Sequence, residues 1–132
     1  MMWGESQCSC VVRGLLLLTF GTVGHMILIN VRFRPLPEHV ATFRDQVAEF
    51  TEKTRAEEGN IFFDWSVNTD DPSEFILIEA FEDDAAEAHV KSEHFKQACE
   101  LFPKILKETP QIINTLIEGK TEWDRMAEFA VR

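Results

Sequence analysis

Residues 57–81 read EEGNIFFDWSVNTDDPSEFILIEAF, and this stretch decides the fold. Gly59 follows a helical pattern, and we expect it to end the helix in a left-handed conformation, which costs least without a Cβ atom. Residues 60–68 and 74–81 carry the alternating and β-branched or aromatic side chains of β-strands. Asp, Pro and Ser between them favour a turn. The stretch therefore predicts a helix end followed by a β-hairpin.

The segments on either side complete a repeated order of elements. Residues 26–34 and 111–119 are predicted strands, and residues 38–58 and 83–107 are predicted helices with apolar side chains at helical spacing. Ser92 is expected to interrupt the second helix, because serine favours the cap position at a helix start. The order β-α-β-β-α-β is typical of a ferredoxin-like α+β fold, in which both helices cover one face of a four-stranded sheet.

The strands carry large apolar side chains on both of their sides. Phe75 and Leu77 alternate with Ile76 and Ile78, so the face without helices would expose apolar surface. We expect a homodimer in which two sheets pack face to face, as in a dimeric α+β barrel. The alternative is a monomer whose N- or C-terminal segment folds over the sheet.

The two ends of the chain fall outside this pattern. Residues 1–25 contain an apolar run that is too short to span a membrane, and Met26 stands directly before the first strand. We expect an upstream extension there, with a leader peptide or a structured arm as alternatives. The domain is expected at residues 26–119, followed by a tail at residues 120–132 with the spacing of a short amphipathic helix.

The composition argues against several partners and cofactors. The 132 residues carry a formal net charge of -10 without a cluster of Lys and Arg, so neither nucleic acid nor a membrane is an expected partner. Cysteines and histidines do not show zinc-finger spacing, and a reducing cytoplasm is the expected location. The sequence also lacks a glycine-rich nucleotide-binding motif and a His-Glu-x-x-His motif.

Several stretches resemble the antibiotic biosynthesis monooxygenase family. They are EEGNIFFDW, DPSEFILIEAFED and AAEAHVKSEHF, together with MILINVRF at the first strand, and the resemblance covers about residues 26–102. It implies a small enzyme that oxygenates or isomerises compact substrates without flavin, haem or metal. The chain is also similar to a branch of the family that acts on a phosphorylated quorum-sensing signal. Because one fold serves many activities, the resemblance indicates the fold better than the substrate.

A cofactor-free reaction with O₂ requires a base, and three residues are the predicted catalytic groups. His89 matches the family's second-helix histidine and can exchange a proton near neutral pH, although a structural hydrogen bond is the alternative. Asn30 looks similar to the catalytic asparagine of haem-degrading members, but Phe81 stands where those members have tryptophan, which argues against haem. Glu79 lies among apolar side chains and is predicted either to transfer protons or to form an ion pair with Arg32.

The predicted substrate-binding residues are polar anchors and an apolar wall: Arg32, Phe63, Trp65, Phe81 and His94. The aromatic members are alternatively plain core. His94 follows His89 by five positions, which on a regular helix turns it about 140° away. We therefore expect no shared metal site, and no cofactor.

These residues lead us to expect a cofactor-independent monooxygenase that oxidises a small aromatic or quinol-like compound with O₂. The first alternative is an isomerase or detoxifying enzyme for a phosphorylated or dicarbonyl metabolite, which would depend on Arg32 or Arg34. The second alternative is a non-enzymatic dimeric module that binds a small ligand. A pocket filled by the protein's own side chains would support that second alternative.

Overall fold

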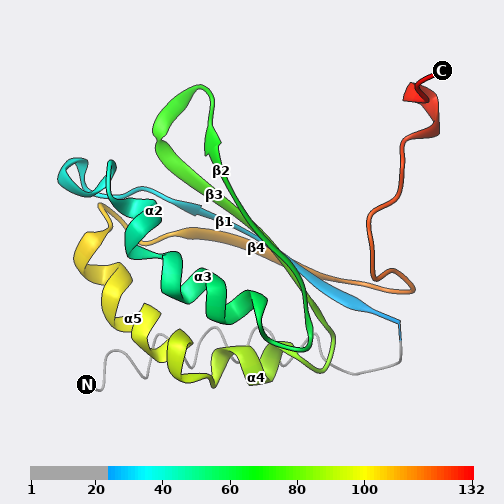
Figure 1. The fold of residues 1–132 in the computed structure, drawn as a ribbon, viewed down its shortest axis with the longest axis horizontal. Helices are drawn as coiled ribbons and strands as arrows, with labels where there is room; N and C mark the ends of the chain where they lie inside the picture. Colours follow the sequence, from blue (N-terminus) through cyan, green and yellow to red (C-terminus); the bar gives the residue numbers. More distant parts are fainter. Residues whose placement is uncertain (1–23) are drawn as a thin grey trace.

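The computed structural model describes residues 24–132, and its strands and helices follow one another in the expected order (Figure 1). The extension expected at residues 1–25 lies outside the described residues, apart from its last two positions. The strands are β1 (Met26–Phe33), β2 (Asn60–Asn68), β3 (Asp71–Glu82) and β4 (Gln111–Ile117). The helices are α2 (Phe43–Gln46), α3 (Ala48–Arg55), α4 (Ala86–Val90) and α5 (Glu93–Ile105), with short 3-10 turns η1 (Pro37–His39) and η2 (Ala127–Phe129).

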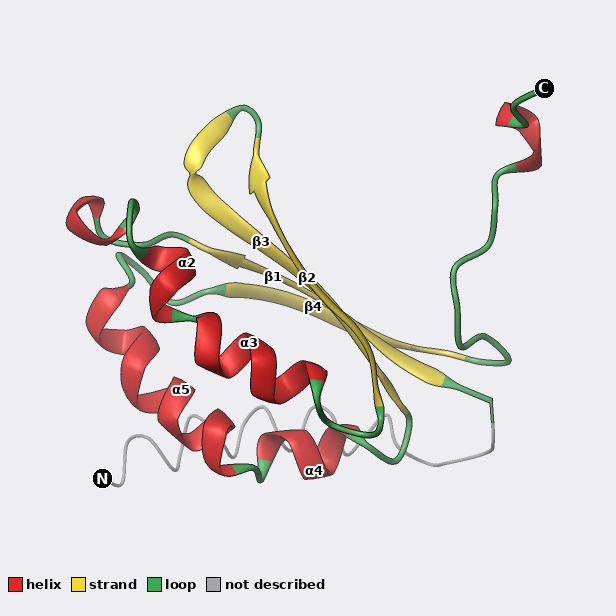
Figure 2. Ribbon diagram, in the orientation of Figure 1, coloured by secondary structure: helices red, strands yellow, loops and turns green. Residues whose placement is uncertain are grey.

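The strands form one antiparallel sheet in the order β2-β3-β1-β4. Figure 2 shows helices α2 to α5 together on one face of this sheet. The predicted ferredoxin-like α+β fold is therefore confirmed. Within the described part of the chain, no helix is long and apolar enough to cross a membrane.

Cross-strand pairing fixes which side chains share a face of the sheet. Ile29 of β1 pairs with Glu79 of β3, and Asn30 pairs with Ile78. Directly paired residues point to the same face, and successive residues of a strand point to opposite faces. Ile29 is buried beneath the helices and Asn30 is exposed. Glu79 therefore lies on the helix-covered face, and Asn30 lies on the open face.

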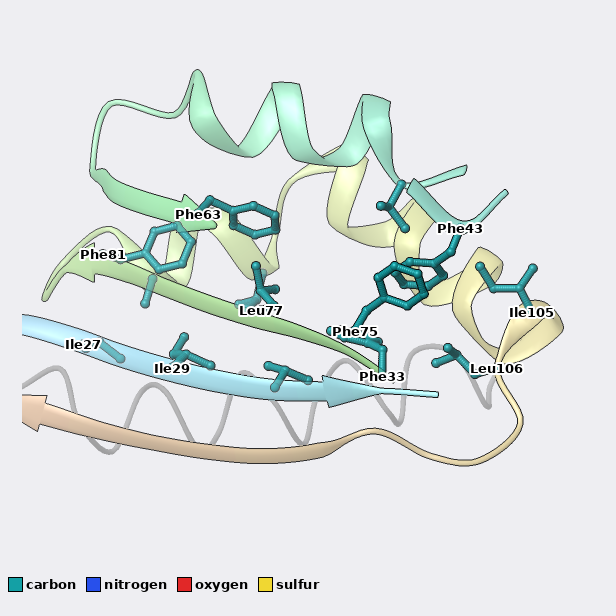
Figure 3. Close-up of a cluster of buried hydrophobic side chains, with 14 residues drawn as sticks. Ile27, Ile29, Phe33, Phe43, Phe63, Phe75, Leu77, Phe81, Ile105 and Leu106 are labelled. Atoms are coloured by element: carbon teal, nitrogen blue, oxygen red, sulfur yellow. The ribbon is translucent and has the colours of Figure 1, made fainter. Parts of the chain in front are cut away.

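Apolar side chains, many of them aromatic, fill the space between the sheet and the helices (Figure 3). Phe43 of α2 stacks on Phe75 of β3 with ring centroids 4.5 Å apart. Phe63 and Phe81 are fully buried in the same layer. Burial of this much apolar surface is the main source of stability for a domain of this size.

Gly59 has a different role from the one predicted. The first predicted helix is divided into η1, α2 and α3, and α3 ends at Arg55, before Gly59. Gly59 does not adopt a positive φ, so the left-handed cap is wrong. A Cβ atom on Gly59 would lie 2.0 Å from the Cβ atom of Ala85, which is far inside van der Waals contact. Glycine is needed here because the loop after α3 touches the start of α4.

The open face of the sheet combines apolar and polar side chains. Ile113 of β4 is 75% exposed, and Asn30, Arg32 and Asp64 are also exposed there. The tail after β4 runs away from the helices (Figure 1) and contains a single 3-10 turn rather than an amphipathic helix. The tail contacts the sheet where the rings of Trp123 and Phe62 lie 5.2 Å apart.

Candidate active site

The candidate site is centred on the carboxylate of Glu57, in the loop between α3 and β2. Its Oε2 atom lies 2.7 Å from Nδ1 of His89 and 2.6 Å from Nε2 of His94. The loop is held by backbone hydrogen bonds, in which Glu57 N–H donates to the carbonyl of Thr54 and Asn60 N–H donates to the carbonyl of Glu57. One oxygen atom thus joins two histidines from two helices. We call Glu57, His89 and His94 the Glu-His-His cluster.

A break between α4 and α5 brings the two histidines together. Ser92 caps α5, accepting a hydrogen bond from the N–H of Phe95, and its hydroxyl donates to the carbonyl of His89. The predicted interruption at Ser92 is confirmed. The expectation that His94 points about 140° from His89 is wrong, because it assumed one regular helix through both residues. The chain changes direction between them, and both rings meet Glu57.

The environment of Glu57 favours its charged form. Burial alone would raise its pKa, but hydrogen bonds and charge interactions with His89 and then His94 lower the pKa below its usual value. An ionised carboxylate can only accept hydrogen bonds. The ring nitrogens that face it, Nδ1 of His89 and Nε2 of His94, therefore carry hydrogen and donate. Glu57 thereby fixes the tautomer of each ring when that ring is neutral.

Glu79 lies on the other side of the His89 ring. Its Oε1 atom is 3.9 Å from Nε2 of His89, and its side chain is 8% exposed. Burial, with a smaller contribution from the negative charge of Glu57, raises the pKa of Glu79 to about 8. Glu79 is therefore mostly protonated at neutral pH. The alternative ion pair with Arg32 is wrong, since Arg32 pairs with Ile76 on the open face of the sheet.

Aromatic rings enclose His89. The centroid of its ring lies 4.6 Å from that of Phe81, 5.1 Å from that of Phe95 and 5.9 Å from that of Phe50. The His89 side chain is only 3% exposed, whereas that of His94 is 14% exposed. Burial of His89 strengthens its electrostatic interaction with Glu57.

A cavity of about 500 Å³ opens beside this cluster. Glu57 is the member of the Glu-His-His cluster that lines it, and neither histidine does. Glu58, Glu82 and Asp84 add three more acidic side chains to its walls. A second cavity of about 660 Å³ lies against α2 and α3 and is lined in part by Trp65.

The structure divides the predicted site residues between two places. His89, His94 and Glu79 come together with Phe81 on the helix-covered face. Asn30 and Arg32 are on the open face, so the sheet separates them from the predicted base. The predicted constellation of His89 with Asn30 and Arg32 is therefore not formed within one chain.

The predicted aromatic wall is mainly core. Phe63 and Phe81 are 1% and 0% exposed, and neither lines either of the two cavities. Trp65 donates a hydrogen bond of 2.8 Å from Nε1 to the hydroxyl of Thr51 and borders only the second cavity. The wall of the cavity beside Glu57 contains no aromatic side chain and combines acidic residues and Ser92 with Gly59, Ala85 and Ala88.

Sequence reasoning did not select Glu57 as a site residue. The stretch EEGN, which begins with Glu57, carries part of the resemblance to the family and could have indicated a site residue. The sequence pattern alone suggested a helix end there. Glu57 and His89 are separated by 32 positions, and no periodicity links a loop to a distant helix. The close packing of Gly59 against Ala85 holds this loop against the start of α4, the helix that carries His89.

The three cluster residues also have the donor atoms of a metal site. One oxygen and two ring nitrogens all lie within 4.8 Å of one another. Two histidines and one carboxylate are a common set of ligands for zinc and for non-haem iron.

Comparison with known proteins agrees with this fold. The model of the family described as antibiotic biosynthesis monooxygenase matches residues 26–101, and the chain belongs to this family. A solved structure described as an antibiotic biosynthesis monooxygenase is 26% identical, with a TM-score of 0.61, over 67% of this chain and 95% of that one. The expected family membership is therefore confirmed.

Two further solved structures share the fold at lower identity. A conserved protein from Methanosarcina mazei Go1 is 23% identical, with a TM-score of 0.64, over 69% of this chain and 91% of that one. Rv0793 from Mycobacterium tuberculosis is 21% identical, with a TM-score of 0.60, over 77% of this chain and 99% of that one. No curated protein matches the chain.

Proposed function

We propose that this protein is a cofactor-independent monooxygenase that oxidises a small, electron-rich aromatic compound such as a quinol with O₂. The observation that carries the proposal is the contact of the Glu57 carboxylate with His89 and His94 at the wall of a cavity. A carboxylate that two imidazoles hold in its ionised form is able to accept a proton from a substrate hydroxyl. The general base is thus Glu57, and His89 acts through it.

The reaction proceeds from the quinol anion. Glu57 removes a hydroxyl proton, the electron-rich ring passes an electron to O₂, and a carbon–oxygen bond then forms. Cleavage of the O–O bond leaves one oxygen atom on the ring and releases the second as water, with protons returned through Glu57. A quinol and O₂ give a hydroxyquinone and water, so the substrate supplies all four electrons. The protein has to supply a base, an orientation and a dry reaction site.

Glu79 completes the acid-base pathway on the buried side. Its protonated carboxyl lies 3.9 Å from Nε2 of His89, the nitrogen that is not bound to Glu57. A small movement brings the two groups into hydrogen-bond contact, so Glu79 can stabilise the neutral ring or return a proton to it. The aromatic rings around His89 keep water out of this pathway.

The charges around the cavity favour a neutral substrate. Four acidic side chains line it, namely Glu57, Glu58, Glu82 and Asp84. A phosphorylated metabolite would be repelled from these walls. A phosphate was expected to need Arg32 or Arg34. Arg32 lies on the open face of the sheet, and Arg34 binds Glu74 at 3.0 Å and Glu108 at 3.1 Å. These charges disfavour binding of a phosphorylated metabolite, which is anionic before any reaction, whereas a quinol enters the cavity as a neutral molecule.

The non-enzymatic alternative has one observation in its favour. The interior between helices and sheet is filled by core side chains such as Phe63 and Phe81. The cavity beside Glu57 is separate from that interior and still offers a titratable group to a ligand. A cavity that is not filled by core side chains and has a carboxylate in its wall favours the enzyme over the binding module.

We also propose that two chains associate through their open sheet faces. Ile113 is 75% exposed on this face, and Phe62, Ile76 and Ile78 are only partly covered. Removing such side chains from water contributes roughly 25 cal/mol per Å² of apolar area. Exposed polar groups such as Asn30 and Arg32 would then pair across the interface or lie at its edge.

Isotope labelling tests the proposed reaction directly. The protein is supplied with a panel of quinols and naphthols under ¹⁸O₂, and products are analysed by mass spectrometry. We expect one ¹⁸O atom in the product and one in water for at least one substrate. Turnover without ¹⁸O incorporation would show an isomerase or a simple oxidase, and no turnover of the panel would support the binding module.

A further inference from the structure

We propose that the Glu-His-His cluster binds a divalent transition-metal ion of the zinc class. Its donors are Oε2 of Glu57, Nδ1 of His89 and Nε2 of His94, which all lie within 4.8 Å of one another. Zinc binds carboxylate oxygen and histidine nitrogen at about 2.0–2.2 Å, so tetrahedral ligand atoms are separated by about 3.4 Å. Side-chain movements of roughly 1 Å are enough to open the two short hydrogen bonds and admit an ion.

The positions of the ligands allow this adjustment. Glu57 belongs to a loop, and its side chain is 18% exposed. His94 is in the first turn of α5, and its side chain is 14% exposed. His89 is fixed among aromatic rings and provides the rigid ligand. One fixed and two adjustable ligands can close around an ion without a change in the fold.

An independent observation is the group behind His89. A histidine that binds a metal commonly donates its other ring N–H to a carboxylate, which orients the ring. Nδ1 of His89 faces Glu57, and Nε2, the other ring nitrogen, faces Oε1 of Glu79 at 3.9 Å. A small movement would let an oxygen of Glu79 accept the Nε2–H of a metal-bound His89, as the orienting group does around such sites.

The acidic cavity provides an entry route for a cation. Glu58, Glu82 and Asp84 line it together with Glu57, and their charges attract divalent ions from solution. Three protein ligands leave one tetrahedral position for water or for another molecule in the cavity.

A bound ion would interfere with the proton transfer that we assign to Glu57. The expected inhibition rests on the proposed function. A Glu57 carboxylate that binds an ion is a much weaker base towards a substrate proton. Zinc would therefore inhibit the oxygenase, whereas the binding itself is independent of any activity.

Calorimetric titration of the untagged, chelator-treated full chain with Zn²⁺ tests the binding. We expect one ion per chain, and an affinity that falls at least about 10-fold in Glu57→Gln and in His94→Ala. The matched controls are Glu93→Gln, at an exposed position beside His94, and His39→Ala, which lies away from the cluster on η1. Both should bind Zn²⁺ like the wild type.

The proposal is overturned if the wild type binds no Zn²⁺, if Glu57→Gln and His94→Ala keep the wild-type affinity, or if the two controls lose it equally. Circular dichroism of each variant shows whether it is folded, and His94→Gln replaces His94→Ala if the latter is not. Substrate is absent throughout. Failure of metal binding therefore leaves the oxygenase untouched, and failure of the oxygenase leaves this test valid.

Discussion

Oε2 of Glu57 lies 2.7 Å from Nδ1 of His89, although the two residues are 32 positions apart in the sequence. This contact joins the loop before the β-hairpin to the helix that follows it. His94 contacts the same oxygen at 2.6 Å, so the three side chains form one hydrogen-bonded cluster. The arrangement places a carboxylate and two imidazoles together, although no catalytic motif in the sequence links these three residues.

Replacing Gly59 by alanine is expected to destabilise the fold by about 1–3 kcal/mol, because the new methyl group would collide with Ala85. Urea unfolding followed by fluorescence measures the effect. The double variant Gly59→Ala with Ala85→Gly should recover part of the lost stability, since it removes the colliding atom. A single variant as stable as the wild type would contradict the close contact.

Replacing Ser92 by alanine is expected to cost about 1 kcal/mol of stability, because α5 loses its capping hydrogen bond. The same change releases the carbonyl of His89 from the serine hydroxyl and weakens the placement of His94. Ser66→Ala, at an exposed position on β2, is the control and should change stability by less than about 0.5 kcal/mol. Equal effects at both serines would argue against a structural cap at Ser92.

Glu79→Gln is expected to change how stability depends on pH. The pKa of Glu79 is about 8 in the folded protein, against 4.5 for an unperturbed glutamate. Below pH 4.5 both states hold this proton, whereas between pH 4.5 and 8 only the folded state does. Its stabilising contribution is therefore complete at low pH and is lost as the pH rises towards 8.

The free energy of unfolding of the wild type should accordingly fall relative to Glu79→Gln by up to about 1.4 kcal/mol per pH unit across this window. Denaturant titrations of both proteins in chelator at several pH values provide the comparison. Groups that do not interact with Glu79 cancel in the difference. Parallel stability curves would mean that Glu79 is not held protonated by its surroundings.

Ile113→Asp is expected to separate the proposed dimer into single chains without unfolding them, because the residue is 75% exposed in one chain. Light scattering coupled to size-exclusion chromatography reports the mass, and circular dichroism reports the fold. Glu93→Gln, on the helix-covered side, should remain dimeric. A wild type that is monomeric at micromolar concentration would remove the proposed interface.

The order of the elements could be predicted because strand and helix periodicities are local. The break at Ser92 was also predictable from the residue type. Its consequence for His94 was not, because a change of direction between two helices depends on what they pack against. Gly59 was predicted to adopt a left-handed conformation. In the structure, glycine is needed instead because a side chain would collide with Ala85.

The site was predicted only in part for the same reason. His89 and Glu79 were selected by residue type and position, and the structure brings them within 3.9 Å of each other. Asn30 was expected with them, but alternation along β1 places it on the opposite face. Glu57 was missed because its importance comes from a contact between a loop and a helix far away in sequence.

The most direct test of the account compares turnover of the wild type, Glu57→Gln and Glu93→Gln, with oxygen uptake measured on the same quinol. The glutamine retains the size of Glu57 but cannot accept a proton, so we expect kcat to fall at least about 100-fold. Glu93→Gln removes the same charge from an exposed position and should retain wild-type kcat. A Glu57→Gln protein that consumes oxygen as fast as the wild type would contradict the assignment of Glu57 as the general base.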